Sequence, residues 1–160
     1  MKFNGLALIT SAIVLGACAG GEKSTTKTET PAAAPAAAPA GAAAAVTGET
    51  VEVKMIGDGK TYHFEPNVIT VKAGGAVKFI NVIGFPHNVG FDPTTVPSSE
   101  QAQLSTNMPG DHMMGALEGP MMLQPNETYT VSFANVKPGV YPIHCTPHLA
   151  LGMKGTITVQ

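Results

Sequence analysis

Short runs of alternating apolar and polar side chains, separated by glycine and proline turns, dominate the sequence from Thr50 onward. Val51, Val53 and Met55 share one face of the first run, and a Gly-Gly turn at 74–75 precedes a later one. A two-residue period is typical of strands, and closely spaced turns suit short strands better than long helices. The sequence therefore predicts an all-β domain over residues 50–160, a Greek-key antiparallel β-sandwich with little helix.

One segment interrupts this pattern. Further strands are expected at 68–71, 77–82, 128–133, 140–145 and 156–159. Residues 93–125, in contrast, are irregular and rich in methionine, and only one short helical turn is expected there, between Ser99 and Leu104. A loop of this length in a small domain usually has a function or covers the core.

Charge excludes several classes of function. The 9 Lys and Arg residues against 11 Asp and Glu give a net charge of −2, so the chain lacks the basic field that nucleic acid requires. The carboxylates form no acid/base pair at a useful spacing, and no glycine-rich phosphate loop is present. We therefore expect a protein that is not an enzyme.

The N-terminus has the pattern of an export signal. In residues 1–17, Lys2 precedes an apolar stretch that is too short to span a bilayer comfortably. The sequence Leu-Gly-Ala-Cys at 15–18 is similar to the bacterial lipobox, in which the cysteine is lipidated. We expect a protein on the periplasmic side, anchored to a bacterial membrane through lipidated Cys18. An ordinary signal cleaved near residue 17 is the alternative.

Residues 18–49 are predicted to form a flexible tether. Ala-rich sequence favours helix, but Pro31, Pro35 and Pro39 recur at a spacing that interrupts one. A partly extended segment of this kind rises roughly 3.1 Å per residue. The tether could serve as a simple stalk, or it could let the domain swing between membrane-bound partners.

The strongest chemical signal lies near the C-terminus. Cys145, His148 and Met153 fall on one loop after a predicted strand, where their side chains can surround one point. A soft thiolate, an imidazole and a weak thioether suit copper in both oxidation states better than magnesium or calcium. His87, on the turn after the strand at 77–82, is the best candidate for a second imidazole.

These motifs resemble the plastocyanin-like small blue copper proteins, the cupredoxins. The resemblance covers roughly residues 50–160. Its specific parts are Pro-His-Asn-Val at 86–89 and the spacing Cys-x2-His-x4-Met at 145–153. Phe-Glu-Pro at 64–66, Lys-Ala-Gly at 72–74 and the stretch 152–156 are also similar to the family.

The resemblance implies one type 1 copper per chain that cycles between Cu(I) and Cu(II). By this resemblance His87, Cys145 and His148 form a trigonal plane, and Met153 is the long axial ligand. Asn88 is then expected to brace the two ligand loops.

The resemblance also indicates an electron carrier. The partners would be redox proteins such as c-type cytochromes or membrane respiratory or photosynthetic complexes, and the protein would be a monomer. Pro147 has no N–H and so cannot donate a hydrogen bond to the sulfur of Cys145.

Other metal sites fit less well. Zinc could be held by one Cys and two His, but a thioether as fourth ligand argues against it. A dinuclear copper centre needs two bridging thiolates, and Cys18 is assigned to lipid. A multicopper oxidase needs more histidines than the scattered His63, His112 and His144.

Two features leave the interpretation open. His144 stands where plant-type plastocyanins have tyrosine, and strand alternation predicts that it points outward, away from Cys145. The loop methionines could pack over the sandwich, dock a redox partner or hold an auxiliary Cu(I); they are Met108, Met113, Met114, Met121 and Met122. The last possibility would make the protein a copper carrier or storage protein that delivers copper to an oxidase. Tyr62 and His63 are interpreted as structural or exposed.

Overall fold

The computed structural model describes residues 44–112 and 114–160. The predicted signal peptide, Cys18 and most of the predicted tether lie outside these residues, as does Met113. Among the helices in the described ranges, none is long and apolar enough to cross a membrane.

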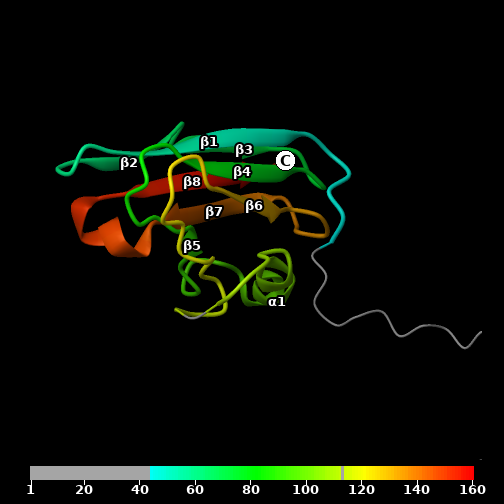
Figure 1. The fold of residues 1–160 in the computed structure, drawn as a ribbon. Helices are drawn as coiled ribbons and strands as arrows, with labels where there is room; N and C mark the ends of the chain where they lie inside the picture. Colours follow the sequence, from blue (N-terminus) through cyan, green and yellow to red (C-terminus); the bar gives the residue numbers. More distant parts are fainter. Residues whose placement is uncertain (1–43, 113) are drawn as a thin grey trace, which may run out of the picture. The chain divides into compact units, whose positions relative to one another are not determined.

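Two four-stranded sheets face each other (Figure 1), which confirms the predicted β-sandwich. The first has the order β2-β1-β4-β6 and the second the order β3-β8-β7-β5. The strands of the first sheet are β1 (Thr50–Gly57), β2 (Tyr62–Glu65), β4 (Ala76–Asn81) and β6 (Thr128–Ser132). Those of the second are β3 (Val68–Val71), β5 (Gly90–Phe91), β7 (Gly139–His144) and β8 (Lys154–Val159).

The pairing is mixed, which corrects the expectation of a wholly antiparallel sandwich. β1 pairs with β4 in parallel, with Val53 opposite Phe79, and β3 pairs with β8 in parallel. The reason is that the chain leaves the first sheet after β2, forms β3 in the second sheet, and returns in β4 beside β1. This long connection through β2 and β3 lets β4 run in the same direction as β1 and opposite to β2, whereas a tight hairpin would make the two strands that it joins antiparallel.

The core fills the space between the sheets. Val53, Phe64 and Phe79 of the first sheet are no more than 1% exposed, and so are Tyr141 and Ile157 of the second. The rings of Phe64 and Phe79 meet edge to face with their centroids 5.9 Å apart. Alternation thus turns one face of each strand inward, as the sequence predicts.

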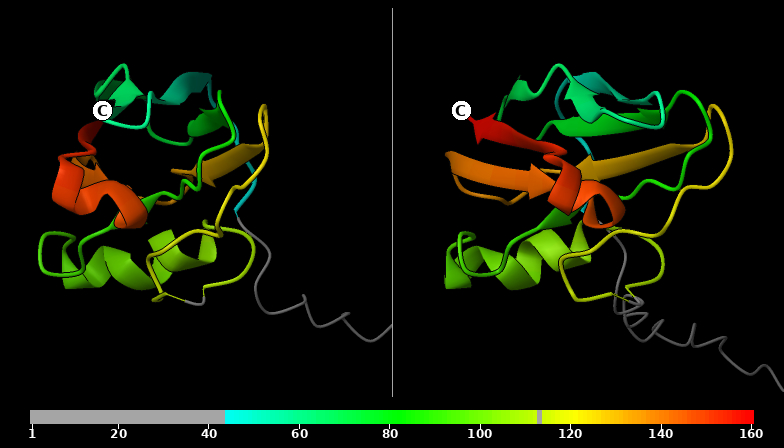
Figure 2. Two further views of the ribbon diagram at one scale, coloured as in Figure 1. Left: turned by 60° about the vertical axis from the view of Figure 1, so that its left-hand side comes forward. Right: turned by 90° about the vertical axis from the view of Figure 1, so that its left-hand side faces the viewer.

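The long loop contains a helix that is longer than the predicted turn. Helix α1 (Ser98–Thr106) lies on the side of β5 and β7 (Figure 2), and its Leu104 is fully buried in the core. Glu100 is buried as well and forms a 2.9 Å ion pair with Lys137. The same carboxylate accepts the backbone N–H of Lys137 at 3.1 Å. These contacts attach α1 to the turn before β7.

Hydrogen bonding to the sandwich begins before β1. The backbone N–H of Ala44 donates to Asn107, and the carbonyl of Ala44 accepts the hydroxyl of Ser132. Thr47 and Gly48 both donate to the carbonyl of Gly74. The packed part of the chain therefore includes several residues ahead of Thr50.

Phe79 provides a test of the core. We expect Phe79→Ala to lower the free energy of unfolding of the copper-free protein by about 3–5 kcal/mol, because it leaves a cavity between the sheets. Val68 is 69% exposed, so Val68→Ala is the matched control and should cost less than about 0.5 kcal/mol. Urea unfolding of both variants measures the difference, and equal losses would contradict this account of the core.

Candidate metal centre

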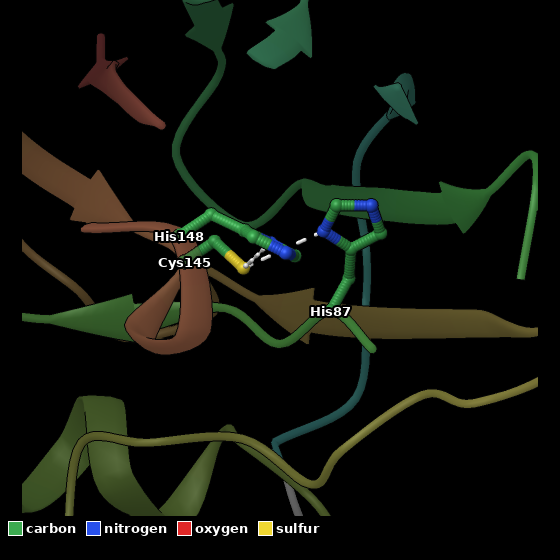
Figure 3. A group of neighbouring side chains, drawn as sticks. All are labelled: His87, Cys145 and His148. Atoms are coloured by element: carbon green, nitrogen blue, oxygen red, sulfur yellow. Dashed lines mark hydrogen bonds between the residues drawn. The ribbon is translucent and has the colours of Figure 1, made fainter. Parts of the chain in front are cut away.

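Three polar side chains from two distant segments meet at one end of the sandwich (Figure 3). His87 lies between β4 and β5, Cys145 directly follows β7, and His148 lies in the 3-10 helix η1 (Thr146–Leu151). The sulfur of Cys145 is 3.5 Å from Nδ1 of His87 and 3.4 Å from Nδ1 of His148. One nitrogen or sulfur from each residue lies within 4.8 Å of the others, close enough to bind one ion.

Backbone pairing fixes His87. Its N–H donates to the carbonyl of Met122 at 3.0 Å, and the N–H of Met122 donates back at 2.8 Å. Before it, the buried side chain of Asn81 binds the carbonyls of Phe85 and Met122 and accepts the N–H of Gly84. Asn81 therefore shapes the turn that delivers His87, a role that no motif in the sequence indicates.

The C-terminal loop folds back on Cys145. The N–H of Cys145 donates to the carbonyl of Met153 at 3.1 Å, and the N–H of Met153 donates to the carbonyl of His148 at 3.2 Å. Pro147 stands in the first turn of η1, and Gly152 ends it with φ of 84°, a conformation that glycine adopts without strain. The turn returns the chain, so Met153 lies fully buried at the start of β8.

Burial keeps this cluster uncharged without a metal. Burial, helped by the nearby His148, lowers the pKa of His87 to about 4. Burial also lowers the pKa of His148 and raises that of the Cys145 thiol. Burial favours the neutral thiol of Cys145, whereas a bound cation would favour the thiolate and release the proton. Two neutral imidazoles and one soft sulfur therefore fit a thiophilic cation that also accepts nitrogen.

Comparison with known proteins identifies that cation. Residues 51–160 match the family described as copper binding proteins, plastocyanin/azurin family. The chain belongs to this family. Copper is its cofactor, and the His-Cys-His cluster fits a type 1 copper site.

Plastocyanins are among the relatives of this chain. That of Scenedesmus fuscus is 39% identical over 110 residues, which are 69% of this chain and 99% of that protein. That of Ulva prolifera is 40% identical over 108 residues, 68% of this chain and 97% of the other. The solved oxidised plastocyanin of Dryopteris crassirhizoma matches with a TM-score of 0.52 and 32% identity, over 69% of this chain and 99% of its own. This similarity supports a copper electron carrier.

Asn88 connects the two ligand loops. Its amide oxygen accepts the N–H of Thr146 at 2.8 Å, and its amide nitrogen donates to the Thr146 hydroxyl at 3.2 Å. These bonds join the residue after His87 to the residue after Cys145. Asn88 thus holds the segment that bears His87 against the segment that bears Cys145.

His144 does not project freely into solvent. It does lie on the opposite face of β7 from Cys145, but only 14% of its side chain is exposed. Its Nε2 lies 2.9 Å from a carboxylate oxygen of Glu118. The side chain is therefore on the predicted face, but Glu118 of the long loop covers it, which strand alternation does not reveal.

Tyr62 stacks on His148. The two rings are nearly parallel, with an interplanar angle of 8° and centroids 3.6 Å apart. Tyr62 is in β2, far from His148 in sequence, so its interpretation as structural or exposed missed this contact. Aromatic residues are common in short edge strands, so the presence of Tyr62 in such a strand gave no signal of its contact with His148.

The described methionines of the long loop divide into two groups. Met108 and Met122 are at most 2% exposed and belong to the core, and Met122 also pairs with His87. Met114 is 44% exposed and, with the half-buried Met121, lines a hollow of about 380 Å³ that Asp111 also borders. Core packing therefore accounts for two of the methionines and leaves two at the surface.

The lowered pKa of His87 predicts acid sensitivity of the copper-free fold. The ordinary pKa of this imidazole is 6.5, and in the folded protein it is about 4. Between pH 6.5 and about pH 4, the unfolded chain therefore binds a proton on His87 and the folded chain does not. The free energy of unfolding should therefore fall as pH falls through this window, by about 3 kcal/mol from His87. Urea unfolding at several pH values gives the slope of the free energy of unfolding against pH, which should be shallower for His87→Gln than for the unaltered protein. Equal slopes in the two proteins would contradict the prediction.

Proposed function

We propose that this protein is a membrane-tethered carrier of single electrons in the periplasm, with His87, Cys145, His148 and Met153 as copper ligands. The observation that carries the proposal is the enclosure of the donors. His87 and Cys145 are fully buried, and His148 is 8% exposed. Copper supplies the one-electron cycle between Cu(I) and Cu(II), and the protein supplies a fixed, dry set of donors.

Rigidity is what the residues contribute to electron transfer. Asn88 joins both loops, the backbone bonds of Met153 hold the C-terminal turn, and Tyr62 supports the ring of His148. A site held in this way changes little between oxidation states, so reorganisation contributes little to the barrier. Pro147 leaves the sulfur of Cys145 without one N–H donor, which limits stabilisation of the reduced, electron-rich state.

The surface near His148 suits contact with a redox partner. Leu149 and Leu151 in η1 are 40% and 57% exposed, and Phe85 on the His87 turn is 38% exposed. Apolar side chains beside a nearly buried ligand favour brief, close contact with a c-type cytochrome or a membrane complex. We place the electron-transfer contact at this end of the domain.

The tether completes the proposal. A lipid on Cys18, followed by the Ala- and Pro-rich segment, would hold the domain within reach of partners in the same membrane. In this proposal the tether ends near Ala44, where hydrogen bonding to the sandwich begins. The domain would act as a monomer.

A copper carrier or storage protein that supplies an oxidase is the second candidate. The observation that favours it is the hollow between Met114 and Met121, where thioethers near the surface could hold Cu(I). Enclosure of the main site favours the electron carrier, because buried ligands release metal slowly.

The visible spectrum of the Cu(II)-loaded full-length chain tests the ligand set. We expect an intense blue thiolate-to-copper band that a mild reductant bleaches and an oxidant restores. Cys145→Ser should abolish the band, since the thiolate is its source. Copper that binds to the unaltered protein without this band would refute the electron-carrier proposal.

Copper stoichiometry separates the two candidates. An electron carrier should bind one copper per chain, and Met114→Leu with Met121→Leu should leave that number unchanged. Equilibrium dialysis with Cu(I) measures it. A second, labile Cu(I) that disappears in the double variant would favour copper delivery.

The lipid anchor is tested by Cys18→Ser in a bacterial host. The unaltered protein should sediment with membranes and the variant should be released into the soluble fraction, because it lacks the acylated thiol. Val46→Ser, which leaves Cys18 in place, is a control and should remain with membranes. Membrane association of the Cys18 variant would contradict lipidation at this residue.

A further inference from the structure

The carboxylate of Glu118 connects both ligand-bearing segments. One oxygen lies 2.9 Å from Nε2 of His144, which donates because a carboxylate only accepts. The other accepts the amide of Asn88 at 2.9 Å and the hydroxyl of Thr146 at 2.8 Å. These partners follow His87 and flank Cys145 on both sides. No copper ligand touches the carboxylate in these contacts, so any effect on the site passes through them or through charge.

The backbone around Glu118 is fixed against β5. Its loop forms a bridge to Gly90, and the N–H of Gly119 donates to the carbonyl of Val89 at 2.8 Å. A side chain at Gly90 would overlap the carboxylate, so the absence of a Cβ there makes room for it. The loop therefore delivers Glu118 to one defined position behind the ligand loops.

The charge of Glu118 reaches the sulfur of Cys145. Burial raises the pKa of Glu118, but hydrogen bonds from His144, Thr146 and Asn88, together with the positive charge that His144 carries when it is protonated, outweigh burial and lower the pKa. The carboxyl is therefore ionised at neutral pH. The pKa of the Cys145 thiol is raised by burial and, in part, by this negative charge.

We propose that Glu118 is a positioning residue of the copper site, which orders both ligand loops and lowers the reduction potential through its negative charge. The proposal rests on the ligand set proposed above. Reduction adds one electron from an external one-electron donor, breaks no bond and removes one positive charge from the site. A fixed anion nearby stabilises the more positive Cu(II) state, and reduction becomes less favourable.

Two substitutions separate charge from geometry in the full-length chain. Glu118→Gln keeps the shape and an acceptor oxygen but removes the charge. Glu118→Asp keeps the charge but withdraws the carboxylate from its partners. Glu49→Gln is the control, because Glu49 is exposed and precedes β1, at the end of the strands away from the ligands.

The first measurement is spectroelectrochemical titration of the copper-loaded proteins. We expect Glu118→Gln to keep the blue band and to raise the ratio of Cu(I) to Cu(II) at a fixed potential by about three- to tenfold. A tenfold change is about 59 mV for one electron. Glu118→Asp should shift the ratio less, and Glu49→Gln should not shift it. If the ratio of Cu(I) to Cu(II) in Glu118→Gln equals that in the Glu49→Gln control, or is lower than in the unaltered protein, the proposal that the charge of Glu118 lowers the reduction potential is overturned.

The second measurement is hydrogen exchange of the Thr146 amide in the copper-free proteins. Its N–H donates to Asn88, which Glu118 holds. We expect exchange to be about five- to tenfold faster in Glu118→Asp, the equivalent of one weakened hydrogen bond, and near the unaltered rate in Glu118→Gln. Unchanged exchange in Glu118→Asp overturns the positioning part. Because this readout needs no copper, failure of the ligand set would appear separately, as a missing blue band in the unaltered protein.

Discussion

Placing two imidazoles and a thiol side by side without water is the constraint on which this structure depends. Each group loses its hydration, and neither ring can carry a proton at neutral pH at this depth. Such a cluster persists only if the surrounding backbone leaves it no alternative position. The mutual hydrogen bonds of His87 and Met122, and the return of Met153 to Cys145, provide this restraint. The rest of the sandwich is a rigid support for these two segments.

The sequence predicts the strands and the grouping of His87, Cys145 and His148 well because both depend on local patterns. Alternation at Val51, Val53 and Met55 reflects burial on one face, and the spacing from Cys145 to Met153 reflects one compact turn. Parallel pairing of β1 with β4 could not be predicted in this way. Strand direction depends on which sheet the chain visits between two strands, and no residue records that locally.

Contacts between distant segments are what the sequence could not reveal. Tyr62 reaches His148 from β2, and Glu118 reaches His144 and Thr146 from an irregular loop. The loop has no periodicity from which its path could be inferred, so its glutamate looked like one scattered carboxylate among several. The cover over His144 was missed for the same reason, since alternation gives the face of a strand but not what covers that face.

The loop that bears Cys145 and His148 is thus supported at two places by different means. On the side of Tyr62, an aromatic ring packs flat on His148. On the side of Glu118, hydrogen bonds and charge act on Cys145 through its neighbours. Apolar packing fixes the position of a side chain without changing the local electrostatic potential. A carboxylate fixes position through its hydrogen bonds and also changes the potential through its charge. The two supports therefore offer separate ways for sequence change to alter rigidity and redox behaviour.

The position of the ligand loop also has a consequence for biosynthesis. Cys145, His148 and Met153 all fall near the C-terminus, and β8, which follows them, pairs with β3 and β7. A chain that is still being synthesised contains His87 but cannot enclose a metal ion with it. Copper capture at the proposed site therefore has to follow synthesis of residues 145–153, and a chain cut short after β7 would retain all four strands of the first sheet yet bind no metal in this way.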